Sequence, residues 1–271
     1  MPRVRLTLAY DGTNFAGSQI QPNQRTVQGE LERVLDVVAG TQPRTTFAGR
    51  TDRGVHAVGQ VAAVTLPTWA ATSRDLQHAL NARLPVDVSA IEADHCGDTF
   101  NPRYEASWRE YRYWIAYPVV SPFLARYAWI RRSELDAEAI EASARLLLGM
   151  HDFASFAGGG EGVPWSGRVA TPRGTTRTVL RCDCREIGLR IGPGSTQLAT
   201  VLEVRVVADG FLPHMVRNIV GALLQVGQGR QHPDWISDLL ARQDRRFGPV
   251  AAPPEGLTLV RVGFAGDVLD D

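Results

Sequence analysis

The segment TTFAGRTDRGVHAVGQVAAVTL, residues 45–66, decides the fold, because two apolar runs flank a short and highly charged crossing. The runs near 44–49 and 58–66 predict two strands. Between them stand Arg50, Asp52 and Arg53, enclosed by glycines. A polar turn is one interpretation of this crossing, and a catalytic carboxylate held by arginines is the other.

The sequence around this pair of strands completes a recognisable unit. Residues 3–10 alternate apolar and polar, which predicts a half-buried strand. Apolar residues at helical spacing predict a helix over 26–38, with Thr26 as its N-cap and Gly40 as its stop. A second helix is expected over about 73–84, and a strand, VDVSAIEA, ends near residue 93.

The same order of elements returns in the rest of the chain. The pattern predicts a strand, a helix, two strands, a helix and a final strand, at 108–117, 134–148, 177–186, 198–208, 214–226 and up to 264. Strand, helix, strand, strand, helix, strand is the split βαβ, ferredoxin-like unit. We therefore predict an α+β fold of two such halves, 1–105 and 106–271, with a central, mostly antiparallel sheet and an active-site cleft.

Composition places the chain among ordinary globular proteins. It has 271 residues, of which 44% are hydrophobic and 21% charged. No run reaches the roughly 18 apolar residues of a membrane helix, and the N-terminus turns polar too early for a secretory signal. Three cysteines do not make a disulfide framework. We expect a cytoplasmic protein that does not bind a membrane.

The charges limit the chemistry. The 29 cations balance 29 anions, so no bulk attraction to nucleic acid is expected, although a local basic groove is compatible with this balance. The chain contains no lysine, which excludes a Walker A loop and Schiff-base catalysis. The pairs His95–Cys96 and Cys182–Cys184 lack zinc-site spacing, so we expect no metal and no cofactor.

Asp52 is the first candidate for chemistry. An aspartate beside glycine is commonly an Asx-turn residue. Arg50 and Arg53 on either side of it would hold the carboxylate ionised, which a nucleophile or base needs and a turn does not. Arg217 lies at the margin of the buried face of the apolar helix over 214–226. It is either a surface residue whose side chain extends to water or a buried partner of Asp52.

Two further segments have both a structural and a functional interpretation. Tyr111 and Tyr113 share one strand face with Arg109. The two rings are either core residues or part of a surface that stacks on a base. The glycine-rich stretch 158–174 predicts a loop, either without a role or acting as a flap on nucleic acid. The flap would use Trp165, Arg168 and Arg173.

The motifs taken together resemble the tRNA pseudouridine synthase A family along nearly the whole chain. Six blocks occur in the order of that family: YDGTNFAG followed by TVQGELERVL, AGRTDRGVHAVGQV, FNPRYEASWREYRYWI, HDFASF, FLPHMVRNIVG and APPEGLTLVRVGF. The resemblance implies a pseudouridine synthase fold and an isomerase that converts uridine to pseudouridine at positions 38 to 40 of tRNA. It also implies a homodimer with a tRNA lying across both subunits, and neither cofactor nor metal.

The resemblance also implies a role for each matching residue. Asp52 would be the nucleophile, and Arg50 would enter the RNA stem and displace the target base. Tyr111 would stack on the flipped uracil, Arg217 would pair with Asp52, and Leu257 would lie against the base.

Three positions depart from the family's pattern. Ser18 stands in place of tryptophan, Arg53 in place of alanine and Pro213 in place of tyrosine. Attack of Asp52 on C1′ of the ribose, attack on C6 of the base, and initial removal of a proton all remain open. The alternative to an enzyme is a non-catalytic RNA-binding protein or RNA chaperone on the same duplicated fold.

Overall fold

The computed structural model of the chain describes residues 3–40, 42–67, 69, 71–118, 121–158 and 174–269. They form two compact units, one of Met1–Arg109 with Thr258–Asp271 and one of Glu110–Leu257. The predicted halves 1–105 and 106–271 leave the last strand in the second half, whereas the units assign residues 258–271 to the first. The reason is a strand pairing between distant parts of the sequence, which a local pattern does not reveal.

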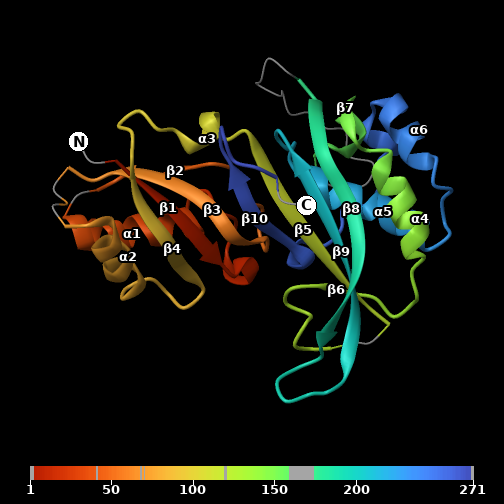
Figure 1. Ribbon diagram of the computed structural model, residues 1–271, viewed down its shortest axis with the longest axis horizontal. Coiled ribbons are helices and arrows are strands. Elements are labelled where there is room, and N and C mark those ends of the chain that lie inside the picture. The colour runs from red at the N-terminus through yellow and green to blue at the C-terminus, as the bar shows by residue number, and fades with distance from the viewer. Residues whose placement is uncertain are drawn as a thin grey trace. The chain divides into compact units, whose positions relative to one another are not determined.

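The first unit follows the predicted order of elements (Figure 1). Its strands and helices are β1 (Arg3–Tyr10), α1 (Val27–Ala39), β2 (Thr46–Phe47), β3 (His56–Thr65), α2 (Ser73–Asn81), β4 (Val88–Cys96), α3 (Pro102–Glu105) and β10 (Leu257–Gly263). The strand order is β4-β1-β3-β10, with β2 paired to β3. β1 is antiparallel to β3 and to β4, and β2 is antiparallel to β3, which is the split βαβ arrangement.

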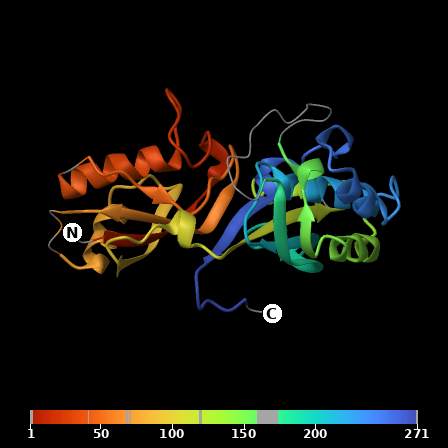
Figure 2. The same cartoon turned by 90° about the horizontal axis from the view of Figure 1, so that it is seen from above.

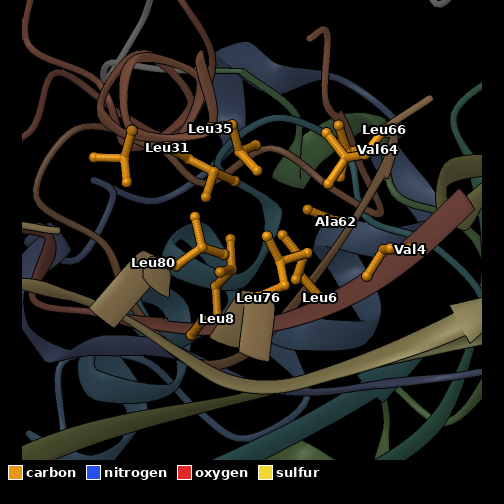
Figure 3. Close-up of a cluster of buried hydrophobic side chains, with 12 residues drawn as sticks. Val4, Leu6, Leu8, Leu31, Leu35, Ala62, Val64, Leu66, Leu76 and Leu80 are labelled. Atoms are coloured by element: carbon orange, nitrogen blue, oxygen red, sulfur yellow. The ribbon is translucent and has the colours of Figure 1, made fainter. Parts of the chain in front are cut away.

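Leucines and valines from four elements form the core of the first unit. Figure 3 shows side chains of α1 and α2 directed toward those of β1 and β3. The helix residues are Leu31, Leu35, Leu76 and Leu80, and the strand residues include Val4, Leu6, Leu8, Ala62 and Val64. α1 runs along one face of the strands (Figure 2). Its start is fixed as the sequence predicts, because the Thr26 hydroxyl accepts a hydrogen bond from the Gly29 N–H at 3.2 Å.

The second unit contains the longest strands of the chain's described residues. Its elements are β5 (Trp108–Tyr117), β6 (Trp129–Ile130), α4 (Ala137–Arg145), β7 (Gly149–Asp152), β8 (Thr176–Arg190), β9 (Leu198–Ala208), α5 (Met215–Gly227) and α6 (Trp235–Arg242). Their sheet order is β5-β9-β8-β7, with β6 parallel to β5. β8 and β9 form a long antiparallel hairpin (Figure 1). The fold-class prediction is confirmed, and α6 is an element that the sequence analysis did not predict.

Helix α5 packs as its apolar spacing predicts. Val216, Ile219, Val220, Leu223 and Leu224 are all buried. Nowhere in the described ranges is a helix both long and apolar enough to cross a membrane. The predicted flap residues Trp165, Arg168 and Arg173 lie outside the described residues.

Candidate active site

Asp52 lies in the crossing between β2 and β3. The Val55 N–H donates to the Asp52 carbonyl at 3.2 Å, which closes a turn over residues 52–55. Thr51 and Val55 are buried, Asp52 is half-buried, and Arg50 and Arg53 are exposed. Two buried residues, Thr51 and Val55, therefore anchor the crossing on either side of Asp52, while its charged side chains are more exposed.

Thr51 is the most closely held of these anchors. Its N–H donates to the Ser18 hydroxyl at 2.9 Å, and its carbonyl accepts from the Ser18 N–H at 3.0 Å. Its hydroxyl oxygen lies 2.8 Å from that of Tyr10, and the two share a hydrogen bond. Tyr10 and Ser18 are 4% and 1% exposed, and burial raises the pKa of Tyr10 to about 12. A neutral phenol is thus part of the support beneath the crossing.

His56 fixes the other end of the crossing. It is buried at the start of β3, and its Nδ1 accepts a hydrogen bond from the Gly12 N–H at 3.0 Å. The Asp11 carboxylate lies 3.3 Å from the same Nδ1.

The two arginines beside Asp52 are placed differently. Arg53 donates to the side-chain carbonyl of Gln24 at 3.3 Å, so it turns toward the loop that precedes α1. Arg50 is exposed and follows Gly49, whose carbonyl accepts from the Gln60 side chain at 3.0 Å. An exposed guanidinium on a fixed backbone suits contact with a phosphate or a base.

The remaining predicted residues belong to the second unit. Tyr111 is buried on β5, and its ring meets that of Phe211 edge to face, with centroids 5.1 Å apart and planes at 87°. Sequence reasoning did not assign Phe211 a role, although its place directly before the Leu-Pro-His-Met start of α5 is a signal that could have indicated it. The rings of Tyr111 and Phe211 therefore pack against each other at this point of β5.

Arg217 is half-buried in the first turn of α5. Its Nε donates to the Ala252 carbonyl at 2.7 Å, and its own carbonyl accepts from the Ala252 N–H at 2.9 Å. The Tyr113 hydroxyl donates to the Pro253 carbonyl at 2.8 Å. Burial is the main reason why the pKa of Tyr113 is raised well above its usual value. One short segment thus holds both Arg217 and Tyr113, and the buried Leu257 follows it.

A comparison with known families matches most of the chain. A sequence model described as tRNA pseudouridine synthase matches residues 7–105 and 143–265. The chain belongs to the tRNA pseudouridine synthase family. In this synthase chain, Arg50 and Asp52 lie in the first matched segment and Arg217 and Leu257 in the second, whereas Tyr111 falls between them.

Relatives from several bacteria match this synthase chain over nearly its full length. The tRNA pseudouridine synthase A of Nitratidesulfovibrio vulgaris (Miyazaki F) is 41% identical, covering 97% of this chain and all of the relative. The enzyme of the same name from Thermosipho africanus is 40% identical with the same coverage. That of Geobacillus sp. WCH70 is 40% identical over 97% of this chain and 98% of its own length.

The cysteine and histidine pairs of the synthase chain form no metal centre in the part of the chain that the structure describes. Within those ranges no group of three or more His, Cys, Asp or Glu side chains is placed to hold an ion. Cys182 and Cys184 lie on β8, where burial raises the pKa of both thiols. These thiols therefore stay protonated near neutral pH.

Proposed function

We propose that this chain isomerises uridine to pseudouridine in the anticodon arm of tRNA, at positions 38 to 40, with Asp52 as the nucleophile. Membership of the tRNA pseudouridine synthase family supports the reaction. The support for Asp52 is its position, half-buried and directly after the buried and fully hydrogen-bonded Thr51. A reacting carboxylate must be held in place while its substrate arrives.

The reaction exchanges one bond between base and sugar for another. The bond from N1 of uracil to C1′ of ribose breaks, the base turns, and C5 bonds to C1′ while a proton leaves C5 and N1 gains one. A base paired in a stem is first flipped out, at about a few kcal/mol. Asp52 then attacks C1′, attacks C6, or first removes a proton, and the proposal includes all three routes.

The other site residues have supporting roles in this proposal. Arg50 displaces the target base, which its exposure allows. Tyr111 stacks on the uracil with its ring held by Phe211, and Leu257 lies against the base. Arg217 pairs with Asp52 to keep the carboxylate ionised, and its bond to the Ala252 carbonyl fixes the direction of its guanidinium.

The assembly and compartment are also part of the proposal. We infer a cytoplasmic homodimer with one tRNA lying across both subunits, an arrangement that rests on the resemblance to the family. A second subunit would give the RNA a longer surface than one chain provides.

The test is an isosteric change at the nucleophile. Asp52→Asn removes the negative charge with little change in size, and it is expected to abolish tritium release from 5-tritiated uridine in tRNA while tRNA still binds. Asp36→Asn makes the same chemical change at an exposed position of α1 and should leave release intact. Normal release by the Asp52 variant would refute the proposal. Tight tRNA binding without release by the unsubstituted chain would establish the RNA-binding alternative.

A further inference from the structure

All polar groups of Thr51 are engaged with two other parts of the first unit. Its N–H and carbonyl both bond to Ser18, at 2.9 and 3.0 Å, and its hydroxyl bonds to that of Tyr10 at 2.8 Å. Thr51 is 5% exposed, so these bonds are shielded from water. Because Thr51 directly precedes Asp52, these bonds fix the position of the peptide group from which the Asp52 backbone begins.

Ser18 is itself tied to helix α1. Its carbonyl accepts from the Gln28 N–H at 2.9 Å, and the Gly17 carbonyl accepts from the Val27 N–H at 3.4 Å. Gly17 has φ of +117°, and a Cβ there would stand 2.9 Å from the Thr51 carbonyl oxygen, so only glycine allows this close approach. Ser18 therefore connects the first turn of α1 to the residue before Asp52.

Tyr10 provides the second connection, from the sheet. It is the last residue of β1, and its hydroxyl also accepts from the Gln60 side chain on β3 at 3.4 Å. The same Gln60 nitrogen donates to the Gly49 carbonyl at 3.0 Å. Gly49 and Thr51 are thus both fixed to neighbouring strands, and Arg50 lies between them.

We propose that Ser18 and Tyr10 are positioning residues for the nucleophile. Neither touches the reacting atoms; they hold the backbone of Thr51 so that Asp52 meets the flipped base in one orientation. The inference rests on the proposed function, since it assigns Asp52 the reaction. A displacement of about 1 Å at a reacting group costs roughly 100-fold in rate. Losing one of these bonds should therefore slow the chemical step and leave the affinity for tRNA unchanged.

The test compares two buried serines whose hydroxyl oxygens each accept a hydrogen bond from a backbone N–H. Ser18→Ala removes the acceptor of the Thr51 N–H. Ser155→Ala removes the acceptor of the Asp244 N–H, at 2.9 Å, and the donor to the Leu239 carbonyl, at 2.6 Å, in the second unit, from a side chain that is 0% exposed. Ser155→Ala should lose at least as much thermal stability as Ser18→Ala, because it removes two buried hydrogen bonds and Ser18→Ala removes one. Only Ser18→Ala should slow single-turnover pseudouridine formation, by about 10- to 100-fold with the dissociation constant for tRNA within about twofold.

Tyr10→Phe is the second variant, because it keeps the buried ring and removes only the hydroxyl. It should slow the same step without weakening tRNA binding, and amide exchange at Thr51 should become faster in both variants. Unchanged single-turnover rates in both, relative to Ser155→Ala, overturn the positioning role while the proposed function stands. Absence of pseudouridine formation by the unsubstituted chain overturns the proposed function and the positioning role together.

Discussion

At the scale of single residues, Tyr10 shows how burial determines the state of a polar group. The phenol is enclosed at the end of β1, and burial raises its pKa to about 12, although hydrogen bonds from Thr51 and Gln60 act in the opposite direction. An ionised Tyr10 would be a buried charge without a cation among its hydrogen-bond partners. The fold therefore needs the neutral form, and its stability must depend on alkaline pH.

This dependence can be measured. The folded pKa of Tyr10 is about 12, and in the unfolded chain a tyrosine titrates near about 10. Because the folded value is the higher, the stabilisation is complete below about pH 10 and is lost as the pH rises toward about 12. The expected loss from Tyr10 is about 2 to 3 kcal/mol. Urea unfolding over this range should show a smaller loss for Tyr10→Phe than for the unsubstituted chain. Equal slopes would contradict the prediction.

The chain suits such a measurement because it contains no lysine. No ammonium group of a lysine titrates in this pH range, and arginine stays charged. Tyr113 and Tyr117, which are also buried, have raised pKa values as well. Their contribution is present in both proteins and cancels in the comparison.

At the scale of elements, α5 and the segment before β10 are built around each other. A Cβ on Gly221 of α5 would stand 2.0 Å from the Val250 carbonyl oxygen. Two residues further along, Ala252 forms the pair of bonds with Arg217. The absence of a side chain at Gly221 thus sets how closely this segment approaches the helix. Its position in turn decides where the Arg217 guanidinium points.

Gly221→Ala should therefore lower the stability of the protein, which is the opposite of what the helix propensities of glycine and alanine predict. In a helix interior alanine is normally about 1 kcal/mol more favourable than glycine. Here the added methyl meets backbone, so a net destabilisation of about 1 to 3 kcal/mol is expected, together with lower pseudouridine formation as Ala252 moves. Gly97→Ala is the control, since a Cβ there has open space around it and should change neither property. Denaturant unfolding and tritium release measure the two effects, and an unchanged or higher stability of Gly221→Ala would disprove this account of the packing.

Local patterns predicted most of these elements and little of what joins them. The spacing of apolar residues located β1, α1, β5, β9 and α5 to within a residue or two, because each depends on neighbours in the sequence. α6 was missed, and β10 was assigned to the second half. Ser18 was noticed only as a departure from the family's pattern, since its bonds to Thr51 cross from one loop to another. Asp52, Arg50, Tyr111, Arg217 and Leu257 as site residues stay predictions.

At the scale of the whole molecule, the first unit is discontinuous in sequence. It begins with Met1–Arg109 and is completed by Thr258–Asp271. β10 pairs in parallel with β3, where Thr258 faces His56 at the end of the Asp52 crossing. Side chains of the segment after β10 also contact the first unit. The ring centroid of Phe264 lies 5.4 Å from that of Phe100, and the Arg5 guanidinium lies 4.9 Å from the Phe264 centroid. In the sequence, the second unit is therefore inserted between the two segments that form the first unit.

A chain that ends at Leu257 should for this reason lose the order of its first unit, although most of that unit lies more than a hundred residues earlier. Removal of β10 leaves β3 with an exposed edge at His56 and takes the aromatic contact from Phe100. Hydrogen exchange of the β3 amides should become much faster, while amides of the β8–β9 hairpin keep their protection, because their partners lie within the second unit. A chain that ends at Asp267 is the matched control. It retains β10, Phe264 and the bond from the Phe264 N–H to the Asp267 carboxylate at 2.8 Å. Equal exchange at β3 in the two shortened chains would show that the first unit is stable without its returning strand.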